Sequence, residues 1–172
     1  SDFINRFADV MNSTFQSNHV IQTIDRMAAS LAPEMGAHVD RWHAPSSLNE
    51  WSNQVKYLRT YAVQRPGFMR QQISTRFGLG GVVPLAVSVN DTNAGAIRVH
   101  SLNIAAPLET PWSGFYFRNH AVEIEAKPRT GYRFARWSGI TNTSSTVMLP
   151  LSSETTLAAH FERDTNSPVP EP

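Results

Sequence analysis

Gly131-Tyr132-Arg133-Phe134-Ala135-Arg136-Trp137-Ser138-Gly139 is the stretch that decides the fold of the second half of this chain. Its aromatic residues alternate with charged ones between two glycines, a pattern typical of a short strand with one apolar face. The preceding run VEIEAKP, residues 122–128, alternates in the same way and ends at a proline. We therefore predict two successive strands joined by a turn at residues 128–131.

Further strands are expected on either side of this pair, because the apolar residues recur with a period of two. The expected strands cover residues 85–89, 96–100, 121–127, 132–137, 145–150 and 156–162, with a short extended piece at 115–117. Residues 107–114 read as a long loop that contains Trp112. Residues 164–172 are rich in proline and are expected to be a disordered tail.

Residues 2–77 instead show a helical period, and we expect five helices there. The first has an apolar stripe that begins with Phe3 and Phe7. Pro33 and Pro66 are expected to open the third and fifth helices, since the first turn of a helix needs no N–H from proline. Ser47 and Glu50 form a capping box for the fourth helix, and Gly78 is expected to end the fifth.

The change of period predicts an α+β chain with its helices and strands segregated along the sequence. We expect a helical part at 1–78, a glycine-rich linker at 79–84, a small β module at 85–163 and the tail at 164–172. The β module is expected to be mainly antiparallel, either β-grasp-like or a small sandwich.

Composition limits the function. The 172 residues carry a formal net charge of +1 and show no run of Lys or Arg longer than two, so we expect no nucleic-acid partner. Cysteine is absent, which excludes disulfides and thiolate metal sites. No apolar run reaches the length of a transmembrane helix. The chain starts without methionine inside a helical pattern, so we expect an excised fragment.

The helical half resembles the C-terminal helical region of the CotH (spore coat protein H-like) kinase family. The resemblance rests on FINRF at 3–7, PEM at 33–35, RW at 41–42 and RPGFMRQQ at 65–72. The β half is similar to the divergent internalin-type B-repeat modules of bacterial surface proteins. There it rests on EIEAKP at 123–128, GYRFARWSG at 131–139 and TTLAAHF at 155–161.

CotH-like proteins are atypical kinases that use ATP and a divalent cation. Their nucleotide- and metal-binding residues precede the matched helices, so the resemblance supplies no catalytic, cofactor-binding or metal residue in this chain. It implies a non-catalytic fragment of an exported bacterial protein, a scaffold beside an absent kinase domain. That upstream kinase domain, surface or coat proteins, and polysaccharide are the expected partners, and the expected location is extracytoplasmic.

Four other groups of residues resemble ligand-binding or catalytic motifs. Gly78-Leu79-Gly80-Gly81 lacks the third glycine of a phosphate-binding loop and is read as a linker. His38, Asp40 and His43 do not share a helix face, which argues against zinc. Glu123 and Glu125 are interpreted as a solvated strand face paired with Arg133. None of the histidines at 19, 100, 120 and 160 shows a serine or cysteine partner in the sequence.

The aromatic cluster between Pro111 and Arg118 has two readings. It contains candidate ligand or partner contacts: Trp112, Phe115, Tyr116 and Arg118. Exposed aromatics on a β scaffold can stack on sugars or peptides, so Trp112 and Tyr116 would be the platform of a carbohydrate- or envelope-binding module. The alternative is that Trp112 folds back to plug one end of the small sheet or seals it against the helices, and we favour the seal.

Overall fold

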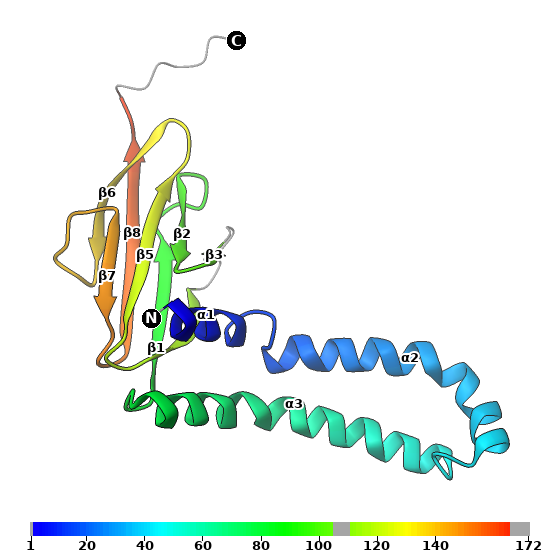
Figure 1. Ribbon diagram of the computed structural model, residues 1–172. Helices are drawn as coiled ribbons and strands as arrows, with labels where there is room; N and C mark the ends of the chain where they lie inside the picture. Colours follow the sequence, from blue (N-terminus) through cyan, green and yellow to red (C-terminus); the bar gives the residue numbers. More distant parts are fainter. Residues whose placement is uncertain (1, 105–110, 166–172) are drawn as a thin grey trace, which may run out of the picture. The chain divides into compact units, whose positions relative to one another are not determined.

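The computed structural model describes residues 2–104 and 111–165 of the chain (Figure 1). Part of the loop expected at 107–114 and most of the tail expected at 164–172 lie outside these residues. The described helices are α1 (Asp2–Met11), α2 (Ser17–Trp42) and α3 (Leu48–Phe77). None of them combines the length and the hydropathy that crossing a bilayer requires.

Three helices replace the five expected, because two prolines lie inside helices and do not open new ones. Pro33 lies within α2 and Pro66 within α3, which have 26 and 30 residues. A proline removes one hydrogen bond of the i→i−4 ladder. In such long helices the remaining hydrogen bonds keep the helix continuous across the proline. The prediction that each proline begins a new helix was therefore wrong.

The end of α3 follows the sequence prediction. Gly78 has φ +64° and donates its N–H to the carbonyl of Thr75, while Leu79 donates to the carbonyl of Ser74. These two bonds form a Schellman motif, which needs a left-handed residue and therefore favours glycine. At the start of α3, Ser47 Oγ accepts from the N–H of Glu50, but the Glu50 carboxylate binds Ser46.

The strands form two four-stranded sheets. The first sheet has the order β4-β1-β8-β6, with bounds β4 (Trp112–Phe117), β1 (Val82–Val89), β8 (Thr155–Arg163) and β6 (Tyr132–Ser138). The second has the order β3-β2-β5-β7, with bounds β3 (Leu102–Ile104), β2 (Gly95–Val99), β5 (Ala121–Pro128) and β7 (Thr146–Pro150). Strands β1 and β8 run parallel, and the other pairs are antiparallel.

Strand β1 begins at Val82, inside the linker expected at 79–84, and not at Leu85. Pro84 is paired with Phe115 of β4, and β8 joins β1 only from Leu85 onward. Proline is acceptable in a strand where one side carries no ladder bond. The glycine-rich connection is therefore shorter than expected.

The aromatic stretch between Gly131 and Gly139 forms β6 and contains a β-bulge. The register with β8 shifts between Phe134 and Arg136. A bulge adds one residue to a strand and so changes which residues share a face. Trp137 is consequently buried, with only 4% of its surface exposed, and its Nε1 donates to the carbonyl of Ser144.

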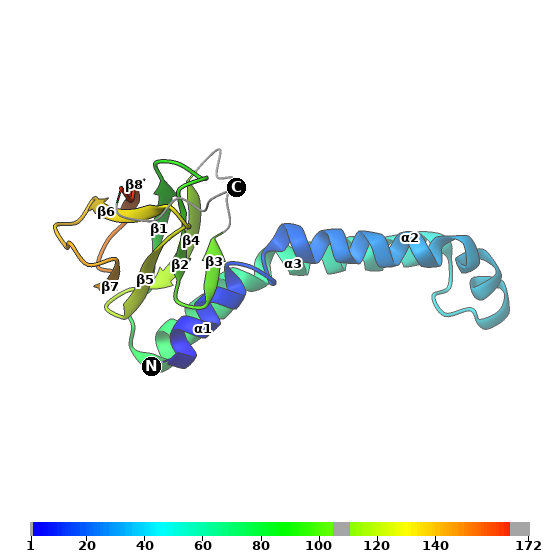
Figure 2. The same cartoon turned by 90° about the horizontal axis from the view of Figure 1, so that it is seen from above.

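The two sheets stack face to face and share one apolar core (Figures 1 and 2). The sheets approach each other closely at Gly95 of β2, where a Cβ atom would lie 2.4 Å from the ring of Phe161 in β8. Glycine is the residue that permits such contact between sheets. The segregated α+β class is confirmed, and of its two expected forms the β part takes that of the sandwich.

Contacts divide the chain into two compact units, which are described separately below. One unit contains residues 1–9 and 73–172, and the other contains residues 10–72. The first turns of α1 thus belong with the β sandwich, although the sequence places them in the helical half. The predicted end of the helical CotH-like part at residue 78 stays a prediction.

Candidate functional site: a buried aspartate and the pocket beside it

The buried face of α1 matches the predicted stripe only in part, since Phe7 packs against the core but Phe3 does not. Phe3 is 55% exposed, whereas Ile4 and Ala8 are buried together with the polar Asn5 and Asp9. The helix is rotated because Asp9 meets hydrogen-bond donors of the β sandwich. Desolvating a carboxylate is tolerated only where such donors replace water.

Asp9 is completely buried and accepts hydrogen bonds from three residues of the sandwich. The hydroxyl of Tyr116 donates to Oδ1 at 2.7 Å. Nδ1 of His100 donates to Oδ2 at 2.6 Å, and Ser101 donates both its N–H and its hydroxyl to the same oxygen. Each of these four groups is a donor, which is what an ionised carboxylate pairs with.

His100 lies in the turn between β2 and β3, with a left-handed φ of 49°. Its Nε2 is 2.9 Å from Oδ1 of Asp2, so both ring nitrogens face carboxylates. Burial by itself lowers the pKa of His100, but the hydrogen bonds and charges of Asp9 and Asp2 outweigh it. The net effect raises the pKa of His100 above its ordinary value of 6.5.

The outer face of the second sheet carries an ion-pair network. Arg98 of β2 contacts Glu123 and Glu125 of β5, at 2.5 and 2.7 Å. Glu125 therefore has a lowered pKa, mainly through its hydrogen bond with Arg98. The expected partner Arg133 was wrong, since β5 pairs with β2 and β7 while β6 belongs to the other sheet. Arg133 binds Glu162 instead.

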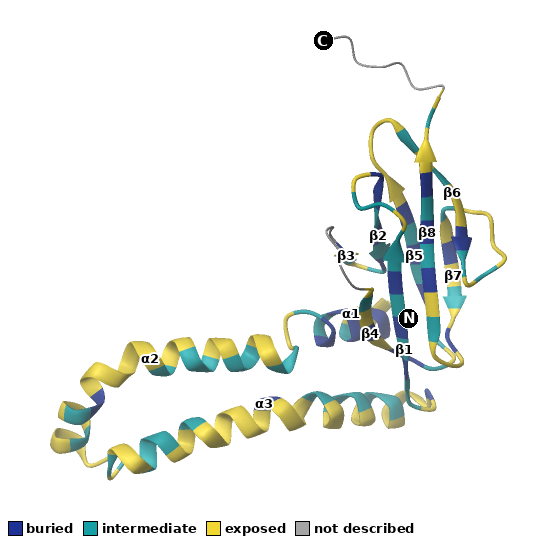
Figure 3. Ribbon diagram, turned by 180° about the vertical axis from the view of Figure 1, so that it is seen from behind, coloured by how far each residue is buried: buried dark blue, intermediate teal, exposed yellow. Residues whose placement is uncertain are grey.

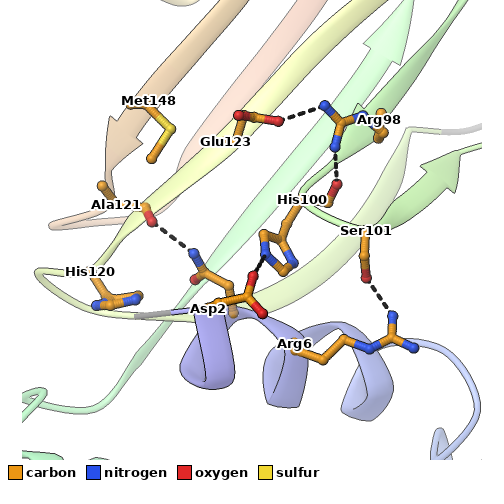
Figure 4. Close-up of a pocket in the computed structure, with 10 residues that line it drawn as sticks. Asp2, Arg6, Arg98, His100, Ser101, His120, Ala121, Glu123 and Met148 are labelled. Atoms are coloured by element: carbon orange, nitrogen blue, oxygen red, sulfur yellow. Dashed lines mark hydrogen bonds and ion pairs between the residues drawn. The ribbon is translucent and has the colours of Figure 1, made fainter.

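A pocket of about 690 Å³ lies between α1 and this face (Figure 4). Figure 4 shows Asp2 reaching His100, Arg6 reaching Ser101, and Arg98 between Glu123 and the carbonyl of His100. The complete lining is Asp2, Asn5, Arg6, Arg98, His100, Ser101, His120, Ala121, Glu123 and Met148.

The structure places the predicted aromatic contacts in strand β4 and its end, not in a loop. Tyr116 is fully buried against Asp9, so its ring is not available to a ligand. Trp112 is half-buried against the core, Phe115 is 45% exposed, and Arg118 donates to the carbonyl of Ser152. The platform of Trp112 and Tyr116 is thus not formed.

The structure gives hydrogen-bond partners to His38 and His160. Nε2 of His38 lies 3.0 Å from the carbonyl of Ala44. His160 does have a serine partner, which the sequence did not reveal, because Ser138 Oγ lies 2.8 Å from its Nε2 across the β6–β8 pair. Among residues 2–104 and 111–165, no group of three or more His, Cys, Asp or Glu side chains is arranged to hold a metal ion.

Sequence reasoning missed Asp9, although a signal existed. Asn5, Asp9 and Asn12 recur at intervals of four and three, next to the apolar Ile4, Ala8 and Met11. All six are buried. A polar stripe beside an apolar one indicates that a helix packs against hydrogen-bonding partners as well as apolar ones.

The second unit is a helical hairpin with little buried surface (Figure 3). Within α2 and α3 only Met35 and Ala62 are buried. An exposed apolar face remains, here called the hairpin face, and its members are 49–66% exposed: Met27, Leu31, Tyr57, Leu58, Tyr61 and Phe68.

Helical geometry places the hairpin face on one side of the two helices. The ion pair between Asp25 and Arg59 marks the opposite side. Met27 is two positions from Asp25, and Tyr57 and Tyr61 are each two positions from Arg59. Two positions correspond to about 160° around a helix axis. Exposed apolar patches of this kind mark interaction surfaces.

The fold and the site define a helical segment whose first turns are built into a small β sandwich. Residues 1–69 match the family CotH kinase protein, and residues 109–165 match the divergent InlB B-repeat domain. Both resemblances drawn from the sequence are thereby confirmed, in the expected order. The B-repeat match starts later than residue 85, so β1, β2 and β3 complete the sandwich from outside it. No curated protein and no solved structure matches the chain.

Replacing Asp9 by asparagine is expected to destabilise the first unit by about 2–4 kcal/mol, because an amide N–H₂ would face donors at a buried position. Urea unfolding followed by circular dichroism measures the loss. Glu162→Gln is the control in the same unit, since it removes an exposed ion pair and should cost less than about 1 kcal/mol. Equal losses in the two variants would contradict the central role of Asp9.

Stability should also depend on pH through His100. Because its native pKa is raised above 6.5, its contribution is complete below pH 6.5 and is lost as pH rises through the native pKa. The free energy of unfolding should therefore fall across this range. His100→Asn, which tolerates the left-handed backbone, should flatten the profile. His43→Asn, at another left-handed histidine with φ 53°, should leave the slope as it is.

Proposed function

We propose that this chain is a non-catalytic region of a CotH-like exported bacterial protein, acting as a structural support and contact region beside a kinase domain. The observation that carries this proposal is the position of α1. Residues 2–9 lie within the CotH match, yet Asp9 is buried among donors of the β sandwich. The sandwich supports the start of the CotH-like helices.

The chemistry of the buried site favours support over catalysis. A general base needs a nitrogen or oxygen within reach of the substrate proton. Both ring nitrogens of His100 are hydrogen-bonded to Asp9 and Asp2, and Asp9 itself is inaccessible to solvent. These groups stabilise each other.

The exposed hairpin face is the reason to propose that the helical unit packs against a partner. It lies entirely within the residues that match the CotH kinase protein family. The kinase domain of the same protein is the partner we propose for it, because a hairpin that buries only Met35 and Ala62 in its helices gains stability from a further apolar surface. Surface or coat proteins and an extracytoplasmic location complete the proposal.

A carbohydrate platform on β4 is less well supported. It needs the rings of Trp112 and Tyr116 together at the surface, and Tyr116 has no exposed area. Trp112 is partly buried and packs against the core of the sandwich, and its sealing role stays a prediction.

The non-catalytic proposal predicts that the chain does not bind nucleotide. Calorimetric titration with ATP and Mg²⁺ should give only the heat of dilution, as should Mg²⁺ alone. A saturable ATP isotherm would overturn the proposal, since a phosphoryl-transfer site requires a phosphate cradle and metal-binding carboxylates.

The kinase domain as partner predicts selective protection of the hairpin face. The sequence has no cysteine, so single cysteines can be labelled with a thiol reagent. Tyr61→Cys should react several-fold more slowly in the protein with its upstream kinase domain than in the 172-residue chain. Val63→Cys, two positions away and 59% exposed, should react equally in both. Equal rates for Tyr61→Cys would contradict the docking.

A further inference from the structure

We propose that the pocket beside α1 binds a neutral ligand rich in hydroxyl groups, such as one sugar ring of a glycan. This inference goes beyond the supporting role proposed above and does not depend on the kinase domain. The pocket belongs entirely to the first unit. Its volume of about 690 Å³ is in the range of small-molecule sites.

The amide oxygen of Asn5, in the pocket wall, is a buried acceptor without a donor in the described part of the chain. Asn5 is only 6% exposed, and its Nδ2 donates to the carbonyl of Ala121 at 2.9 Å. Its Oδ1 is buried and has no hydrogen-bond partner among the described residues. A buried amide oxygen without a partner costs about 1–3 kcal/mol, so a rotation of the Asn5 side chain that turns this oxygen toward the pocket and pairs it with a ligand O–H is favourable.

The charges around the pocket largely cancel and favour neither sign of ion. Asp2 and Glu123 are balanced by Arg6 and Arg98, and the lining charges are mostly held in ion pairs within the protein. Arg98 is held by Glu123 and Glu125, and His100 by Asp2 and Asp9. An ion would have to compete with these existing pairs, whereas a neutral ligand leaves them intact.

Hydroxyl groups fit the remaining chemistry of the lining. A hydroxyl both donates and accepts, so it can pair with Asn5 Oδ1 or a carboxylate oxygen and also with an N–H of Arg6. Met148 is 60% exposed at the pocket and offers an apolar contact for the C–H face of a ring. Polar groups of both kinds beside an apolar patch are what a sugar requires.

The test is an NMR titration of the whole chain with methyl β-glucoside and with N,N′-diacetylchitobiose, at millimolar concentrations. The side-chain amide resonances of Asn5 report directly on the proposed contact and should shift saturably. A preference for the disaccharide would indicate a polysaccharide as the source, and a preference for the glucoside a free sugar. Inorganic phosphate and methylammonium serve as charged comparators.

Matched arginine variants complete the test. Arg6→Ala should weaken sugar binding about tenfold, the effect of losing one charge-assisted hydrogen bond. Arg136→Ala, which likewise removes an exposed arginine bound to a serine hydroxyl, should leave affinity unchanged. The proposal is overturned if Asn5 does not respond to either sugar, if a charged comparator binds more tightly, or if both variants weaken binding equally. Amide spectra of both variants verify the fold.

Discussion

The structure of the first unit depends on one buried carboxylate. Asp9 is desolvated completely, and the cost is offset because Tyr116, His100 and Ser101 direct donors at it. Those residues lie in β4 and in the turn between β2 and β3, so one side chain connects both sheets to the first helix. Packing alone could accept α1 in several rotations, whereas hydrogen bonds of defined direction accept one.

This arrangement changes how the two family matches relate. The CotH match contains α1 and most of the hairpin, but the contacts of residues 1–9 belong to the sandwich. The B-repeat match contains β4 to β8, and β1 lies between β4 and β8 in the same sheet. Sequence families and structural units therefore overlap along this chain. The helical hairpin of residues 10–72 is inserted, along the sequence, between the two segments that form the first unit.

The sequence predicted what depends on local periodicity and failed where distant residues decide. The end of α3 at Gly78 and most strands were predicted, because a left-handed cap and period-two alternation are local signals. The helix boundaries expected at the two prolines were wrong, because a long helix tolerates the loss of one backbone hydrogen bond. The partner of Glu125 was wrong because the turn at 128–131 passes between sheets, and periodicity does not encode strand order. For the candidate site, Asp9 required knowledge of Tyr116, which is 107 positions away.

That separation has a consequence for biosynthesis. A ribosome releases α1 before the strands and adds the aromatic hydroxyl that Asp9 needs only after 107 further positions. At cellular elongation rates this delay is on the order of ten seconds. During it the nascent carboxylate remains hydrated and the helix has no sandwich to join, so the first unit closes only when nearly the whole chain has emerged.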